Sequence, residues 1–233
     1  GFDPNYLAFC GLMIAAFIIG EIAIIDVSDA AQLRLEYPQL LTVRLGNAQR
    51  MDYKIRYLAA AAEKRPVIVL DGMCGSGKST LAQALSKRLN APQIHMDDFF
   101  LPFALRTPQR LGETGGNIHY ERFEAEVLPF VGKEEVFSYR CFSCHDGTFS
   151  PACCPAGGLR IVEGSYSLHP RFMKAWQDMQ ALTVFLSVPE EEQLRRITLR
   201  NPELVQQFSS RWIPMENAYF ETFEVAKKAR LRL

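Results

Sequence analysis

The chain has 233 residues, of which 48% are hydrophobic and 22% are charged, a composition typical of a globular protein with a buried core. Its 26 basic and 26 acidic residues balance, which excludes a protein that coats nucleic acid through bulk charge, so any phosphate binding must be local. Six cysteines are too few for a secreted disulfide scaffold, and we expect a cytoplasmic protein with free thiols.

Residues 1–65 precede the regular part of the chain and contain one very apolar segment, residues 7–25. The uninterrupted part of this segment ends before Glu21 and is shorter than the roughly 20 residues that span a bilayer. We interpret it as a buried helix or a helix–strand pair and not as a membrane anchor. The apolar spacing within residues 51–64 predicts an amphipathic helix. Residues 1–65 are therefore predicted to be an N-terminal helical and strand extension, whose role is unknown.

From Pro66 onward, strands alternate with helices, which is the pattern of a parallel sheet with helices on both faces. The expected strands are the short apolar runs 67–70, 93–96, 159–164 and 182–188. The expected helices are 79–90, the segment from Tyr120 up to Pro129, 189–200 and 214–231. The segment 132–158 is interpreted as a loop because it is rich in Cys, Pro and Gly.

Residues 72–79, GMCGSGKS, match the phosphate-binding pattern G-x-x-x-x-G-K-[ST] at every fixed position. The motif follows a predicted strand and opens a predicted helix, so its glycines can wrap the backbone around phosphates at a helix N-terminus. Lys78 would reach the β- and γ-phosphates of ATP, and Ser79 would bind Mg²⁺. We therefore predict an α/β P-loop NTPase domain over residues 66–233. The expected ATP-binding residues are Gly72, Gly75, Ser76, Gly77, Lys78, Ser79 and Thr80.

Three acidic residues, Asp97, Asp98 and Glu163, follow predicted strands at the carboxyl edge of the sheet. Ligands of open α/β sheets bind at this edge. A carboxylate there can accept the proton of an attacking hydroxyl, and we expect Asp97 to be this base, with Asp98 as the alternative. Glu163 is expected to hold Mg²⁺ with Ser79, directly or through water.

Four arginines lie close together in the second half of the domain: Arg195, Arg196, Arg200 and Arg211. Arg196 and Arg200 share one face of a predicted helix because they are four residues apart. Arginines on a mobile flap can clamp the transferring phosphoryl group and exclude water. We predict a lid near residues 195–211 in which Arg196 and Arg200 act in catalysis. The alternative is a solvated helix face paired with the acidic residues 190–192.

Taken together, five stretches resemble the uridine kinase-like branch of the P-loop kinases, which also includes phosphoribulokinase and the bacterial pantothenate kinases. The stretches are DGMCGSGKSTLA, MDDFF, YERF, IVEGSYSLHP and FLSVPEEEQLRRI, and the resemblance covers about residues 66–230. It implies an enzyme that uses ATP and Mg²⁺ to phosphorylate a hydroxyl of a small molecule. A nucleoside, uridine or cytidine, is the leading acceptor.

The resemblance also implies roles for individual residues. Asp97 matches the aspartate that activates the 5′-hydroxyl of the nucleoside, Glu163 matches the acid at the end of an E-G strand, and Arg195, Arg196 and Arg200 resemble a lid helix. Tyr139 and His145 resemble a tyrosine and a histidine that contact the base. The expected acceptor-site residues are Asp98, Phe100, His119, Tyr139 and His145. The sequence N-I-H-Y stands where the family has D-H-P, so pantothenate and a sugar phosphate stay open as alternative acceptors.

The cysteines of residues 141–154 form a C-x-x-C-H sequence followed by a C-C pair: Cys141, Cys144, Cys153 and Cys154. This spacing differs from the common two-knuckle zinc pattern, which has a second C-x-x-C. We interpret these residues as ordinary thiols and leave metal binding and redox activity open.

Two other functional classes are compatible with the phosphate loop. A regulatory NTPase would hydrolyse ATP without any acceptor, and a nucleotide-binding module without catalysis would be insensitive to Asp97→Asn. The expected partner is a small-molecule acceptor, without nucleic acid or membrane, and a homo-oligomer is left open.

Overall fold

The computed structural model describes residues 47–233, and residues 50–233 form one compact unit. The predictions for residues 1–46, including the apolar segment 7–25, lie outside the described residues. In residues 47–233, no helix is long and apolar enough to cross a membrane.

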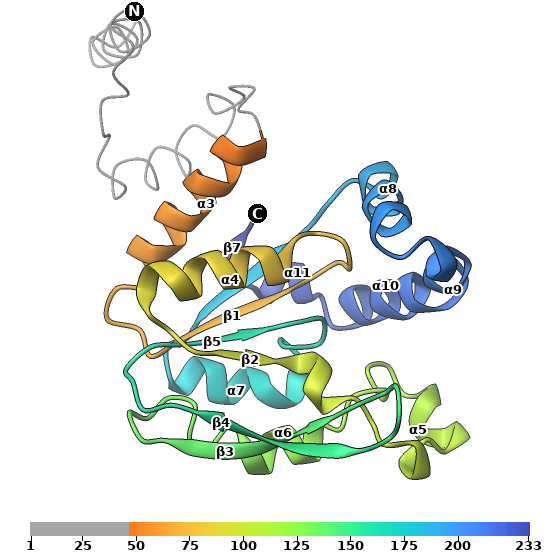
Figure 1. The fold of residues 1–233 in the computed structure, drawn as a ribbon, viewed down its shortest axis with the longest axis horizontal. Coiled ribbons are helices and arrows are strands. Elements are labelled where there is room, and N and C mark those ends of the chain that lie inside the picture. The colour runs from red at the N-terminus through yellow and green to blue at the C-terminus, as the bar shows by residue number, and fades with distance from the viewer. Residues whose placement is uncertain (1–46) are drawn as a thin grey trace, which may run out of the picture. The chain divides into compact units, whose positions relative to one another are not determined.

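The centre of the domain is a five-stranded parallel sheet with the strand order β2–β5–β1–β6–β7 (Figure 1). Its strands are β1 (Val67–Gly72), β2 (Gln93–His95), β5 (Arg160–Glu163), β6 (Leu182–Leu186) and β7 (Leu231–Arg232). The central strand β1 is buried along its whole length, as expected for a parallel strand that is covered on both faces. The predicted α/β P-loop NTPase fold is thereby confirmed.

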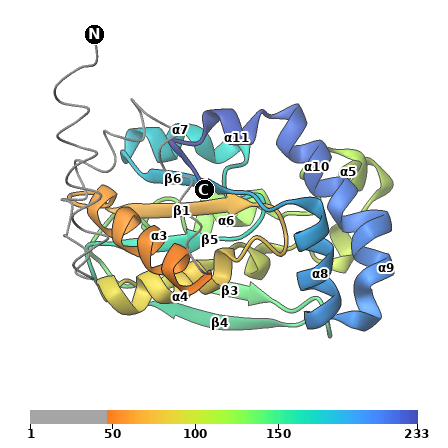
Figure 2. The same cartoon turned by 90° about the horizontal axis from the view of Figure 1, so that it is seen from above.

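Helices cover both faces of the sheet (Figures 1 and 2). The α-helices are α3 (Asn47–Ala61), α4 (Lys78–Leu89), α5 (Pro108–Gly112), α6 (Tyr120–Glu126), α7 (Pro170–Asp178), α8 (Glu190–Arg200), α9 (Val205–Gln207), α10 (Ile213–Thr222) and α11 (Val225–Lys228). Short 3₁₀ turns are η2 (Met96–Phe99), η3 (Phe103–Leu105) and η4 (Pro202–Leu204), and a π-turn, η5 (Phe208–Trp212), joins α9 to α10. Helices α8 to α10 lie beyond the carboxyl ends of the strands in both views.

Alternate residues of β1 serve two different hydrophobic cores. Val67 and Val69 belong to an aromatic-rich core that α6 and α7 cover, whereas Ile68 and Leu70 belong to an aliphatic core beneath α3 and α4. Because side chains alternate between the faces of a strand, a continuously apolar run was the correct signal for this position.

The segment 132–158, predicted to be a loop, contains an antiparallel hairpin of β3 (Phe137–Phe142) and β4 (Phe149–Cys154). On β3 the buried residues Phe137, Tyr139 and Phe142 pack towards the domain, while their neighbours are more exposed. Tyr139 stacks on Phe99 with ring centroids 5.5 Å apart. The loop prediction was wrong because this aromatic packing stabilises strands that contain Cys, Ser and Pro.

Two predicted helices are shorter in the structure. The helix predicted from Tyr120 up to Pro129 ends as α6 at Glu126, and the helix predicted over 214–231 is divided into α10 and α11 before β7. The break lies at Glu224, which has a left-handed backbone with φ of 52°. A left-handed residue cannot continue a right-handed helix, so the chain turns there.

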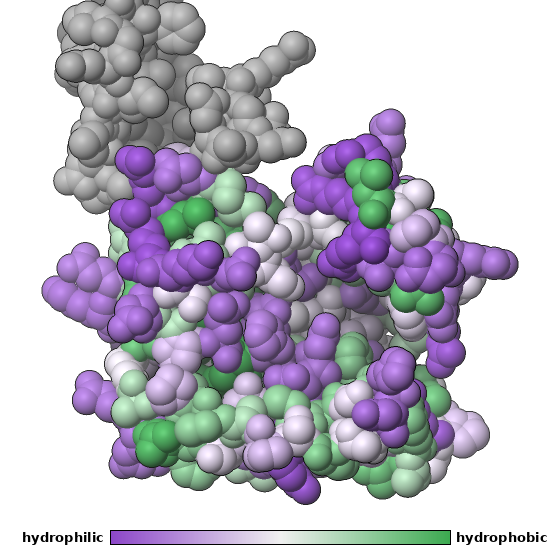
Figure 3. Space-filling model, viewed as in Figure 1, coloured by the Kyte–Doolittle hydropathy of each residue, from purple (hydrophilic) through white to green (hydrophobic). Residues whose placement is uncertain are grey.

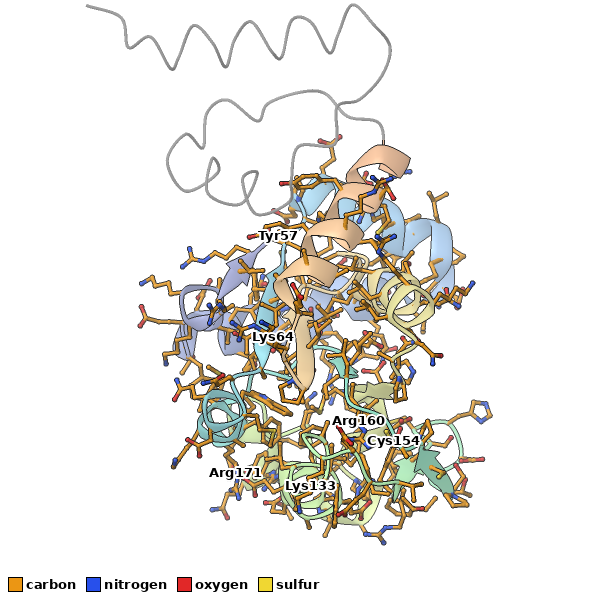
Figure 4. The ribbon with its side chains drawn as sticks, turned by 90° about the vertical axis from the view of Figure 1, so that its left-hand side faces the viewer. Tyr57, Lys64, Lys133, Cys154, Arg160 and Arg171 are labelled. Atoms are coloured by element: carbon orange, nitrogen blue, oxygen red, sulfur yellow. The ribbon has the colours of Figure 1, made fainter. Side chains whose placement is uncertain are left out.

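Buried Arg160 is the first residue of β5, at the end of the strand away from the phosphate loop. It donates to the backbone carbonyls of Phe130, Val131 and Glu135. Figure 4 shows Arg160 beside Cys154 at the end of the hairpin. The five described cysteines are free, and residues 47–233 contain no group of three or more metal-ligating side chains.

Candidate active site

The phosphate loop connects β1 to α4 and depends on glycine at particular positions. Gly72 has φ of 134°, and a Cβ atom there would lie 2.0 Å from the backbone oxygen of Leu186 in β6. Gly77 has φ of 94° and precedes α4 without any side-chain cap. The first amides of α4 are therefore left without intrahelical partners at the positive end of the helix, which is the arrangement that binds phosphate.

Other atoms of the loop are also suited to an anion. The Ser76 hydroxyl is buried and has no hydrogen-bond partner within the described part of the chain. The buried Lys78 ammonium donates to the carbonyls of Gly72, at 2.6 Å, and of Met73, at 2.9 Å. These contacts keep a positive charge against the loop, so the residues present fit a nucleotide phosphate.

Glu163 connects two elements at the carboxyl edge of the sheet. Its Oε2 accepts a 3.1 Å hydrogen bond from Ser79 Oγ, and its Oε1 lies 2.6 Å from Nδ1 of His95. The contact with Glu163 raises the pKa of His95. Because Mg²⁺ prefers hydroxyl and carboxylate oxygens, the Ser79–Glu163 pair fits this ion.

The two aspartates of η2 have different surroundings. The side chain of Asp97 is partly open to solvent. Desolvation of its carboxyl by the surrounding protein nevertheless raises its pKa, and the charge of Glu163 adds to this effect. The carboxylate of Asp98 instead lies 3.4 Å from the hydroxyl of Tyr139, on the hairpin. The structure thus places Asp97 in the electrostatic environment of Glu163 and Lys78 and places Asp98 against the hairpin.

Arg122 holds the hairpin against η2. Its buried guanidinium donates to the carbonyls of Asp98 and Arg140 and lies 4.3 Å from the centroid of the Phe99 ring. A buried charge stacked on an aromatic ring and bonded to carbonyls fixes the relative positions of these elements.

Of the remaining predicted acceptor residues, Phe100 and His119 lie on paired backbone segments, whereas His145 lies apart in a turn. Phe100 is half-buried and forms a backbone bridge with Ile118. His119 lines a cavity of about 340 Å³ that Leu101, Leu105 and Arg110 also line. His145 is exposed in the turn between β3 and β4.

Helix α8 packs on the phosphate loop. Gln193 donates to the carbonyl of Cys74 at 2.9 Å, and Arg196 donates to the carbonyl of Gly75 at 2.9 Å. Arg195 is paired with Glu192, and Arg200 bonds to its neighbour Asn201. Arg211 is exposed. Of the four arginines, all in the described part of the chain, only Arg196 donates to the loop. Figure 3 shows a hollow in the surface beside α8.

Several residues of the site were missed in the sequence analysis. His95 had a signal, because it ends a strand at the carboxyl edge two residues before Asp97. Gln193 also had one, since it shares a helix face with Arg196 three residues later. The roles of Arg122 and of buried Asp71 depend on residues distant in sequence, and no local pattern indicates them.

No family model matches the chain. Among solved structures, a possible uridine kinase from Bacillus stearothermophilus superposes with a TM-score of 0.60 and 20% identity, covering 79% of this chain and 99% of that one. YFH7 from Saccharomyces cerevisiae, a proposed P-loop-containing kinase with a circular permutation, superposes with a TM-score of 0.53 and 13% identity, covering 76% of this chain and 95% of that one.

One curated protein is similar in sequence. A shikimate kinase from Rhodopseudomonas palustris is 37% identical over 71 residues, which are 30% of this chain. The chain spans about a third of the length of this relative, 34%. The chain shares its fold with the two solved structures described above.

Proposed function

We propose that this protein is an ATP- and Mg²⁺-dependent kinase that transfers the γ-phosphate of ATP to a hydroxyl of a small molecule. The observation that carries the proposal is the arrangement around Glu163, which accepts a hydrogen bond from Ser79 of the phosphate loop and contacts His95 at the end of β2. One carboxylate thus connects the nucleotide-binding loop to the strand end that leads into η2, where the candidate base Asp97 lies.

In this mechanism, the amides at the start of α4 bind the phosphates and Lys78 balances the charge of the β- and γ-phosphates. Ser79 and Glu163 would hold Mg²⁺, which would supply positive charge to the transferring phosphoryl group. Asp97 accepts the proton of the acceptor hydroxyl. The oxygen of that hydroxyl bonds to the γ-phosphorus while the bond between the γ-phosphorus and ADP breaks. A raised pKa makes Asp97 a better proton acceptor, and the proton then passes to solvent.

We assign the acceptor side to η2 and the β3–β4 hairpin, because Asp98 and Tyr139 meet there next to Asp97. A nucleoside, uridine or cytidine, is the leading acceptor by the resemblance of the motifs. Pantothenate and a sugar phosphate are the alternatives. Cytoplasmic localisation is part of the same proposal, in keeping with free thiols.

The test is ADP release by the full chain with ATP and Mg²⁺, measured with each of a panel of acceptors. The panel contains nucleosides, pantothenate, sugar phosphates and, because of the curated relative, shikimate. We expect one acceptor to stimulate ADP release and to become phosphorylated. The matched control is Lys78→Ala, which should remove the stimulation. Steady ADP release that no acceptor stimulates would contradict the proposal and favour a regulatory NTPase.

A further inference from the structure

Glu216 is a buried carboxylate on α10 that contacts the phosphate loop. It is only 8% exposed. Its Oε2 accepts a 2.8 Å hydrogen bond from the backbone amide of Cys74, and its Oε1 accepts a 2.6 Å bond from the hydroxyl of Ser165, two residues after the end of β5. A carboxylate bonded to a loop that binds anions needs an explanation, because the negative charges of Glu216 and a phosphate would repel each other.

The distribution of the loop amides gives that explanation. Between Met73 and Ser76, the protein itself supplies several acceptors: the amide of Met73 donates to Leu186, that of Cys74 to Glu216, and that of Ser76 back to Met73. The first amides of α4, from Lys78 onward, have no partner within the helix. Glu216 therefore bonds to an amide before the part of the loop that is left open for phosphate.

The backbone of Cys74 is held at both its N–H and its carbonyl. Glu216 of α10 accepts from the Cys74 N–H, whereas Gln193 of α8 donates to the Cys74 carbonyl at 2.9 Å. The Ser165 hydroxyl, which donates to Glu216, also lies 3.2 Å from the carbonyl of Gly72 at the start of the loop. Helices α8 and α10 thus contact backbone groups of the loop that have no partner within the loop itself.

We propose that Glu216 is a positioning residue for the nucleotide site: it fixes the first half of the phosphate loop so that the remaining amides and Lys78 face the phosphates. The inference rests on the proposed function, because it takes the loop to bind ATP. Without the carboxylate, the Cys74 amide loses its acceptor and the loop populates other conformations. The apparent nucleotide affinity then falls in proportion to the fraction of molecules that still adopt the binding conformation.

Two substitutions separate hydrogen bonding from charge. In Glu216→Gln, the amide oxygen can still accept from Cys74, and the new NH₂ group can donate to Ser165, whose hydroxyl can turn to the Gly72 carbonyl. In Glu216→Ala, both contacts are lost. Glu221→Ala, which removes an exposed carboxylate from the same helix, is the matched control.

The experiment measures binding of Mg·ATP and Mg·ADP to the full-length variants by calorimetry, and hydrogen exchange of the loop peptide that contains Cys74. We expect Glu216→Ala to lose roughly tenfold to a hundredfold in nucleotide affinity, the factor that corresponds to a charge-assisted hydrogen bond. Exchange at the loop should accelerate in this variant without nucleotide. Glu216→Gln should stay within about threefold of the wild type in affinity, as should Glu221→Ala, and both should keep slow exchange.

Several outcomes would overturn the inference. Tighter nucleotide binding by Glu216→Ala would mean that the carboxylate competes with phosphate. Equal affinity in Glu216→Ala and wild type, or slow exchange in both, would mean that the loop does not depend on Glu216. A wild-type chain that binds neither nucleotide would overturn the proposed function as well, whereas wild-type binding with unchanged variants would overturn this inference alone.

Discussion

Asp71 is a fully buried carboxylate directly before the phosphate loop, and Asp71→Asn should change how stability depends on pH. The carboxylate accepts hydrogen bonds from the amides of Gly72 and Leu168, at 2.6 and 2.8 Å, and from the hydroxyl of Tyr219, at 2.8 Å. Burial nevertheless raises its pKa from the ordinary 3.8 to about 6, since removing the charge from water outweighs these bonds.

The magnitude follows from the shift. A raised carboxyl pKa means that the folded state binds the proton more tightly than the unfolded state does, so this group stabilises the fold below pH 3.8. That stability is lost as the pH rises to about 6. The difference between about 6 and 3.8 is roughly 2 pKa units, which corresponds to about 3 kcal/mol. Asparagine cannot ionise, so the variant lacks this loss.

We therefore expect the unfolding free energy of Asp71→Asn, minus that of the wild type, to rise by about 2 kcal/mol between pH 4 and pH 7, most of the full change, because part of the loss has already occurred at pH 4. The assay is urea denaturation at several pH values, followed by the fluorescence of buried Trp176. Titrations common to both proteins cancel in the difference. A difference that stays constant with pH, or that falls as the pH rises, would refute the reasoning, because it would mean that the folded protein does not raise this pKa.

The other predictions concern the loop and the base. Lys78→Ala should lower the rate of ATP-dependent phosphorylation about 100-fold or more, whereas exposed Lys87→Ala, on the same helix, should leave it unchanged; steady-state kinetics measure both. Asp97→Asn should lower kcat roughly 100-fold or more with ATP affinity unchanged, and the same pattern in Asp98→Asn instead would show that the base is wrongly assigned. Gly72→Ala should destabilise the fold by roughly 3 kcal/mol or more in urea denaturation, because its Cβ atom would lie 2.0 Å from a backbone oxygen of β6; a loss below about 1 kcal/mol would contradict this geometry.

The sequence alone determined four strands of the sheet, β1, β2, β5 and β6, and the phosphate loop, whereas β7 was not predicted. Parallel strands buried on both faces appear in the sequence as short apolar runs. The loop appears as a fixed spacing of glycines followed by Lys78 and Ser79. These features depend on contiguous residues, because the backbone angles at Gly72 and Gly77 and the helix that follows are local requirements. The position of Glu163 and Asp97 at one edge then follows from the rule that parallel strands end together.

The tertiary structure alone decided which other side chains surround the loop. The hairpin at residues 137–154 depends on the packing of aromatic residues of β3 against η2, and β4 has no alternating burial pattern. Only Arg196 of the four arginines donates to the loop, which the spacing of the arginines did not indicate. Glu216 contacts an amide 142 residues earlier in the chain. A hydrogen bond across that separation depends on how two helices pack against the sheet, so no spacing within the sequence could predict it.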